Sequence, residues 1–168
     1  IRIRGLTQKE IIERIPSDTE VIGLGCMFTS HWIYVRELVS EIRKSFPNVF
    51  LLMGGEHVTG FPKFSLEQAP LDCVIMGEGE ETIIELLSTI KSNNYDKLSS
   101  IKGIGYNFED RIIINKRRYR RIELDSIEIP DWKSFNIKEY HENRFVGGMY
   151  SHNLTIPILA TRGCPYQC

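Results

Sequence analysis

The sequence lacks any apolar run long enough to cross a membrane. Its longest, residues 49–53, has five residues, whereas a helix that spans a bilayer needs about 20. The first residues, Ile1-Arg2-Ile3-Arg4, lead into a polar stretch rather than into the apolar core of a secretory signal. An initiator Met is also missing. We therefore expect a cytoplasmic protein without a membrane span, in which this chain is an internal part.

Cysteine is scarce and charge is balanced. The four cysteines, Cys26, Cys73, Cys164 and Cys168, are too few and too unevenly spread for a disulfide framework, and the first two lie in apolar surroundings typical of core residues. With 21 basic and 22 acidic residues the net charge is -1, so no overall positive field attracts nucleic acid or anionic lipid. A length of 168 residues with 42% apolar content indicates one globular domain with at most a short appendage.

The first hundred residues alternate short apolar segments with amphipathic ones. The apolar segments at residues 21–24, 49–53 and 73–76 are typical of strands buried on both faces. Thr7 and Glu10 form a capping box that starts a helix. Two further helices are indicated by apolar stripes at Val35, Leu38, Val39, Ile42 and Phe46, and at Ile83, Ile84, Leu87 and Ile90. The pattern predicts a doubly wound α/β fold, a parallel sheet with helices on both faces.

The pattern changes after residue 100. Residues 103–108 and 112–115 flank a polar pair and predict a β-hairpin. Proline and glycine then interrupt a stretch without apolar periodicity, which predicts a surface linker. The expected organisation is an α/β domain over residues 1–100, a hairpin extension over 101–123, a linker over 124–157 and the start of a further domain at 158–168.

Glycine follows each predicted parallel strand. Ligands of open parallel sheets bind beyond the carboxyl ends of the strands, and glycine lets the backbone approach a ligand without a Cβ atom in the way. The candidate binding residues are Cys26, Met27, Phe28, Thr29 and Ser30, then Gly54, Gly55, Glu56, His57, Val58 and Thr59, and then Gly77, Glu78, Gly79 and Glu80. The alternative is that these glycines only serve tight turns, but three such ends at one edge favour a binding site.

Several common ligands are excluded by what these strand ends lack. No aspartate ends a strand to accept a phosphoryl group, GxGxxF at residues 23–28 lacks the third glycine of a dinucleotide fingerprint, and no Walker lysine follows a glycine loop. His57, alone in its loop, is expected to form a hydrogen bond rather than to ligate a metal. The acidic pair at residues 80–81 is expected to stabilise the start of a helix rather than to catalyse.

Six basic residues and no acidic one lie between residues 111 and 121. Such a run is typical of a solvated edge strand that charge protects from further pairing. Alternatively, it could face a nucleic acid, with Tyr119 stacking on a base. The net charge of -1 favours the first interpretation.

The end of the chain has the spacing of a metal-binding loop. Cys164 and Cys168 are separated by three residues and follow Arg162-Gly163. Two such thiolates suit a metal or an iron–sulfur cluster better than a structural disulfide. On their own they do not complete a cluster.

Taken together, these motifs resemble the cobalamin-binding domain of cobalamin-dependent radical S-adenosylmethionine enzymes, of the oxidative cyclase and methyltransferase type. The hairpin and four motifs carry the resemblance: GGEHVTGFP, GEGEET, LDSIEIPDW and TRGCPYQC, at residues 54–62, 77–82, 124–132 and 161–168. The last motif is similar to the opening of that family's CxxxCxxC motif. The set is specific and extends over nearly the whole chain.

The resemblance implies a flavodoxin-like (Rossmann-like) domain that binds cobalamin, a linker, and from residue 158 the start of a radical domain with a 4Fe-4S cluster and S-adenosylmethionine. It makes the residues at the three strand ends candidate cobalamin contacts. It makes Cys164 and Cys168 the first two cluster ligands. The implied partners are the radical domain of the parent chain and a small-molecule substrate, and a nucleic acid is not expected.

Two features depart from the family pattern. The third cysteine of the motif would lie beyond Cys168, so we expect the parent protein, and not this chain alone, to be an enzyme. The motif DxHxxG, which carries a lower cobalt ligand where it is present, does not occur, and a strand and helix are expected before Ile1. The leading hypothesis is a cobalamin-binding domain of a radical methyltransferase or cyclase. The alternatives are a domain of the same fold that has lost cobalamin and serves as a platform for a substrate or partner, and a module that faces nucleic acid through residues 111–121.

Overall fold

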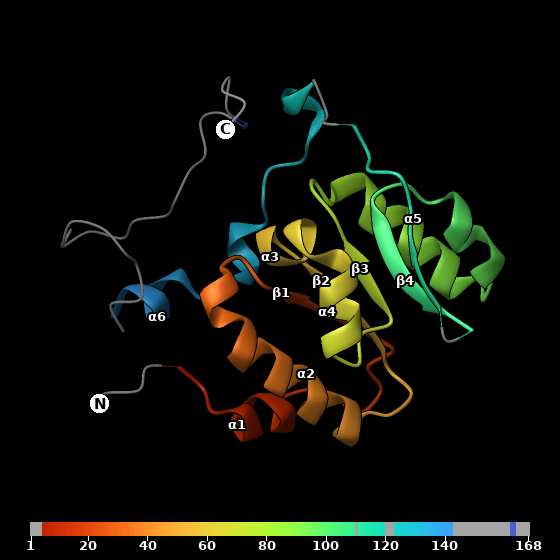
Figure 1. Ribbon diagram of the computed structural model, residues 1–168. Helices are drawn as coiled ribbons and strands as arrows, with labels where there is room; N and C mark the ends of the chain where they lie inside the picture. Colours follow the sequence, from red (N-terminus) through yellow and green to blue (C-terminus); the bar gives the residue numbers. More distant parts are fainter. Residues whose placement is uncertain (1–4, 110, 120–122, 143–161, 164–168) are drawn as a thin grey trace. The chain divides into compact units, whose positions relative to one another are not determined.

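The computed structural model describes residues 5–109, 111–119, 123–142 and 162–163, drawn in colour in Figure 1. The chain divides into two compact units, Ile1–Leu124 and Asp125–Cys168. Within the described residues, no helix combines the length and the apolar character needed to cross a membrane.

The first unit is built on one five-stranded sheet with the order β1-β2-β3-β4-β5. The strands β1 (Val21–Gly25), β2 (Phe50–Gly54) and β3 (Cys73–Ile75) are parallel. The strands β4 (Ile104–Phe108) and β5 (Arg111–Ile114) form the expected hairpin, and β4 pairs antiparallel with β3. The hairpin therefore extends the same sheet, because its buried residues Ile104 and Tyr106 need the cover that a place beside β3 provides.

Helices cover both faces of this sheet, which confirms the predicted α/β fold class. On one face, a core cluster joins the sheet to α1 (Gln8–Glu13), α2 (Trp32–Ser45), α3 (Glu56–Gly60) and α4 (Pro62–Gln68). On the other face, a second cluster joins it to α5 (Glu80–Lys91) and to the 3-10 helix η2 (Tyr95–Ser100). In Figure 1, α2 and α5 accordingly lie on opposite sides of the strands.

The helix signals in the sequence were accurate in two of three cases. The capping box of α1 is present, with the Glu10 amide donating to the Thr7 hydroxyl and the Thr7 amide donating to the Glu10 carboxylate. The predicted stripe of α2 faces the core. In α5, however, Ile84 is 69% exposed and Leu87 is also exposed, whereas Leu86 is fully buried. The inward orientation expected for Ile84 and Leu87 was wrong.

The helix α5 is rotated from the predicted orientation because two threonines take core positions. Thr82 and Thr89 are both buried on the side of α5 that packs toward the sheet. The Thr82 hydroxyl donates to the Lys102 carbonyl at 3.3 Å, which satisfies it inside the core. A pattern that counts only apolar residues cannot register this face.

The second unit contains short helical elements among its described residues. These are the 3-10 helix η4 (Trp132–Ser134) and the helix α6 (Ile137–Glu142), and a further 3-10 turn, η3 (Leu124–Ser126), spans the boundary between the units. Asp131 caps η4 by accepting a hydrogen bond from the Lys133 amide at 3.1 Å. The expected start of a further domain at residues 158–161, and the cysteines Cys164 and Cys168, lie outside the described residues. The domain boundaries drawn from the sequence stay a prediction.

Candidate functional site

The three glycine-bearing loops lie at one edge of the sheet. Gly25 and Gly54, the last residues of β1 and β2, are paired in register. The parallel strand β3 ends nearby and is followed by Gly77. The candidate loops at residues 26–30, 54–59 and 77–80 thus follow the carboxyl ends of adjacent parallel strands, which is where open α/β sheets bind ligands.

The backbone at this edge is bare. A Cβ atom added at Gly25, Gly54 or Gly77 would meet no heavy atom within 4 Å. Beside these glycines, the side chains of Met27 and Phe28 are 60% and 61% exposed. The edge therefore offers uncovered backbone flanked by apolar side chains, a surface that suits a broad, partly apolar ligand.

Gly55 serves a different purpose from its neighbour Gly54. Its φ is +105°, and an added Cβ would lie 2.5 Å from the carbonyl oxygen of Cys26. The Cys26 peptide is fixed there, because its N–H donates to the Gly54 carbonyl at 2.9 Å and its carbonyl accepts from the His57 amide at 3.1 Å. Gly55 is thus required by the packing of the loop after β1 against the start of α3, whatever the loop binds.

His57 is buried in an aromatic cluster rather than exposed at the edge. Only 2% of its surface is accessible, and its ring stacks on Trp32 with the ring centroids 4.5 Å apart. The Nδ1 atom lies 3.2 Å from the Thr29 hydroxyl oxygen, as expected for a hydrogen-bonding group. Burial lowers the pKa of His57, so the imidazole is neutral at pH 7. Its Nε2 and the Trp32 Nε1 have no hydrogen-bond partner among the described residues.

The candidate residues fall into two groups by exposure. Three have buried side chains and hold the loops in place: Cys26, His57 and Val58. The others are half-buried or exposed and can meet a ligand at the edge: Met27, Phe28, Thr29, Ser30, Gly54, Gly55, Glu56, Thr59, Gly77, Glu78, Gly79 and Glu80.

Two arginines of the basic run reach this edge, which was not predicted from the sequence. Arg117 donates to the Thr59 carbonyl at 2.8 Å. Arg118 donates to the Thr82 hydroxyl at 2.9 Å and pairs with Glu85 at 2.7 Å. The signal in the sequence was the place of these residues just after the last strand of the hairpin, because β5 runs parallel to β3 and ends at the same edge.

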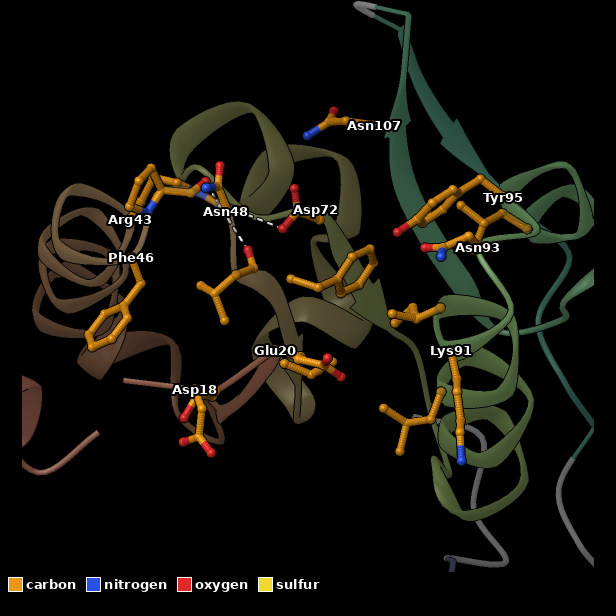
Figure 2. A pocket seen from close by; sticks show the side chains of 18 of the residues that line it. Asp18, Glu20, Arg43, Phe46, Asn48, Asp72, Lys91, Asn93, Tyr95 and Asn107 are labelled. Carbon is orange, nitrogen blue, oxygen red and sulfur yellow. Dashed lines mark hydrogen bonds and ion pairs between the residues drawn. The ribbon is translucent and has the colours of Figure 1, made fainter. Parts of the chain in front are cut away.

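A hollow of about 1450 Å³ in the first unit lies at the opposite edge, beside the amino ends of β1 and β2 (Figure 2). At its rim, the Arg43 guanidinium pairs with Asp72 at 2.6 Å and donates to the carbonyls of Val49, Pro47 and Pro70. These bonds join the end of α2 to the strands. Ligands of open parallel sheets bind at the carboxyl ends of the strands, so the candidate site is the one at the other edge.

A metal centre is not assembled within the described residues, where no group of three or more His, Cys, Asp or Glu side chains is placed to hold an ion. Cys26 and Cys73 are both free and buried. Burial raises the pKa of both thiols, for Cys73 to well above its usual range. The predicted cluster ligands Cys164 and Cys168 lie outside the described residues.

Helices on both faces of the sheet and bare backbone at its carboxyl edge are typical of α/β domains that bind ligands at the carboxyl ends of their strands. The profile of the B12 binding domain family matches residues 1–87, about half of the chain. The chain belongs to this family. The match confirms the resemblance stated from the sequence motifs, and with it the flavodoxin-like fold and the cofactor, cobalamin, that defines the family.

Relatives of this chain include a cyclase and two methyltransferases. It is 31% identical over 139 residues to the anaerobic magnesium-protoporphyrin IX monomethyl ester cyclase of Cereibacter sphaeroides, covering 81% of this chain and 22% of the cyclase. It is 26% identical over 156 residues to the cobalamin-dependent radical SAM methyltransferase TokK of Streptomyces tokunonensis, covering 90% of this chain and 21% of that protein. An uncharacterized methyltransferase of Pyrococcus horikoshii is 28% identical over 153 residues, with 90% and 31% covered.

A solved structure shares the fold. The radical S-adenosylmethionine methyltransferase TsrM from Kitasatospora setae, with cobalamin and a 4Fe-4S cluster bound, aligns with a TM-score of 0.58 and 17% identity. The alignment covers 72% of this chain and 23% of that one. The chain thus spans about a third or less of the length of the relatives it matches.

Proposed function

We propose that this chain binds cobalamin at the carboxyl edge of its sheet, within a radical S-adenosylmethionine enzyme that methylates or oxidatively cyclises a small molecule. The bare backbone at Gly25, Gly54 and Gly77 carries the proposal. The family match supports the cofactor, and the names of the cyclase and methyltransferase relatives support the two reactions.

The residues at the edge fit the chemistry of cobalamin. The cofactor has a broad corrin ring and a long nucleotide tail, so a site for it needs uncovered backbone and apolar surface together. Gly25 and Gly54 provide the first, and the exposed side chains of Met27 and Phe28 provide the second. Cobalamin supplies cobalt–carbon bond chemistry that side chains do not have.

The buried residues of the motif have a supporting role in this proposal. His57 holds Thr29 through its ring and holds Cys26 through its backbone amide. It acts as a positioning residue that fixes the loop after β1, rather than as the cobalt ligand. The proposed contacts are the exposed and half-buried residues of the three loops.

The cluster and the substrate belong to the parent protein in this proposal. Cys164 and Cys168 supply the first two thiolates of a 4Fe-4S cluster, and the radical domain that follows supplies the third and binds S-adenosylmethionine. The small-molecule substrate meets cobalamin from this chain and S-adenosylmethionine from the radical domain, so both parts are needed for the reaction.

Cobalamin retention tests the proposal directly. The full-length protein is mixed with hydroxocobalamin, desalted, and examined by visible absorption. We expect one cobalamin per chain. A protein that emerges colourless supports instead a platform that has lost the cofactor, and RNA binding with a steep salt dependence would support the module that faces nucleic acid.

A further inference from the structure

The segment after β5 is drawn along the carboxyl edge by backbone hydrogen bonds. Beyond the end of the sheet ladder, the Met76 amide donates to the Gly103 carbonyl at 2.7 Å, and the Gly103 amide donates to the Lys116 carbonyl at 2.8 Å. These bonds continue the pairing of β3 with β4, and of β4 with β5, past the ends of the strands. They place the next two residues, Arg117 and Arg118, beside the loops that follow β2 and β3.

Arg117 joins two of these loops through one threonine. Its guanidinium donates to the Thr59 carbonyl at 2.8 Å. The hydroxyl of the same Thr59 accepts a hydrogen bond from the Gly77 amide at 2.9 Å. Thr59 therefore links the segment after β5, the loop after β2 and the loop after β3.

Arg118 fixes the first turns of α5. Its Nε donates to the Thr82 hydroxyl at 2.9 Å, and its two terminal nitrogens pair with Glu85 at 2.7 Å and Glu81 at 3.3 Å. The arginine side chain is only 19% exposed, although both carboxylates are about half exposed. Solvent therefore partly screens the ion pairs. The directed hydrogen bonds fix the position of the Arg118 guanidinium against α5.

Gly103 allows this close approach. Its φ is +80°, and an added Cβ would lie 3.3 Å from the Thr82 hydroxyl oxygen and 3.5 Å from the Arg118 Cβ. A larger residue at this position would crowd the Thr82 hydroxyl to which Arg118 donates, whereas the 3.5 Å to the Arg118 Cβ is an ordinary van der Waals contact. The sequence therefore provides both the arginine and the space in which it lies.

We propose that Arg117 and Arg118 form a latch that sets the spacing between the loops at residues 54–59 and 77–80, and so shapes the cobalamin site. The inference rests on the proposed function. Both arginines are positioning residues, because their contacts are to loop backbone and to α5 rather than to the bare edge itself. The two core clusters that hold the sheet together do not include them.

Hydrogen exchange of the full-length protein without cobalamin tests the latch itself. In the double variant Arg117→Ala and Arg118→Ala, we expect the Gly77 amide and its neighbours in the loop after β3 to exchange at least tenfold faster. Arg111→Ala is the matched control, because it removes the same charge from an exposed position on β5. Unchanged exchange in the double variant would overturn the proposal.

Cobalamin titration tests the consequence for binding. We expect the double variant to bind hydroxocobalamin about tenfold more weakly than the parent, whereas Arg111→Ala binds as the parent does. The swapped pair Arg118→Glu with Glu85→Arg should recover part of the affinity that Arg118→Glu alone loses, which a general loss of stability would not produce.

The two readouts separate the latch from the function on which it rests. Faster exchange with weaker binding supports both. If the double variant exchanges faster but the parent protein binds no cobalamin, the proposed function is overturned, and with it the role of the latch in binding. The effect of the two arginines on the loops would still be supported. Equal affinity in the double and parent forms overturns the latch as a determinant of the site.

Discussion

Adjacent glycines at the end of β2 give the sharpest test of where cobalamin binds. Gly54 and Gly55 lie in the same loop, yet only Gly55 is confined by protein atoms. Replacing each in turn by Val applies the same chemical change to two different surroundings. We expect Gly55→Val to damage the fold and Gly54→Val to damage binding.

The cost of Gly55→Val is set by its own backbone and by Cys26. A φ of +105° with a ψ of 174° is a conformation populated almost only by glycine, and it costs a residue with a side chain about 1–3 kcal/mol. The Cβ would also lie 2.5 Å from the Cys26 carbonyl oxygen, and relieving such overpacking costs about 1–3 kcal/mol. The sum, about 2–6 kcal/mol, lowers the melting temperature by roughly 4–24 °C at about 2–4 °C per kcal/mol.

Gly54→Val should leave the fold intact. Its Cβ would meet nothing within 4 Å, and valine suits a strand, so the free energy of unfolding should change by less than about 1 kcal/mol. If the cofactor packs on this backbone, the valine side chain occupies its volume. An overpacking cost of about 1–3 kcal/mol then weakens binding by about 5- to 150-fold.

The assay is equilibrium titration of the full-length protein with hydroxocobalamin, with a thermal melt of each variant. Gly60→Val is the control, because an added Cβ at Gly60 also meets nothing within 4 Å and no cofactor contact is proposed there. Parental affinity in Gly54→Val would show that cobalamin does not pass the end of β2. A parental melting temperature in Gly55→Val would refute the argument from Cys26.

Three further predictions concern stability and reactivity. Burial lowers the pKa of His57, so the unfolded chain binds its proton first and the free energy of unfolding falls below pH ~6.5, by at most ~1.4 kcal/mol per pH unit; denaturant titrations of His57→Phe should lack this component. In the same assay, Arg43→Ala should lower the free energy of unfolding by about 2–3 kcal/mol and leave cobalamin binding unchanged. Arg36→Ala should change the free energy of unfolding little. Cys26 and Cys73 should resist iodoacetamide in native protein, as peptide mapping would show.

The strands and the α2 helix were predictable from the sequence because burial alone determines them. The run at residues 49–53 is apolar throughout, and β2 lies between strands on both sides with helices on both faces. The stripe that includes Val39 and Ile42 faces the core, and both residues are almost completely buried. The place of the hairpin was not predictable, because pairing between β3 and β4 depends on contacts distant in the sequence.

The roles of individual residues in the three loops were less predictable than the position of these loops at one edge of the sheet. The three glycine loops were located from the sequence, but the reason for each glycine differs. Gly54 faces open space, whereas Gly55 avoids Cys26, about thirty residues away along the chain. A sequence motif records that both are glycine and does not record which backbone each one faces.

The roles of the basic residues between 111 and 121 were also not predictable from the sequence. Its charge suggested either a solvated edge strand or a surface for nucleic acid, because composition registers charge without its partners. The structure directs Arg117 to a carbonyl oxygen and Arg118 to two carboxylates, so at least these two charges are used within the chain. Since β5 runs parallel to β3, the residues that follow it must reach the carboxyl edge. The topology of the sheet, more than the charge of the run, therefore explains why these arginines lie beside the loops of the proposed cobalamin site.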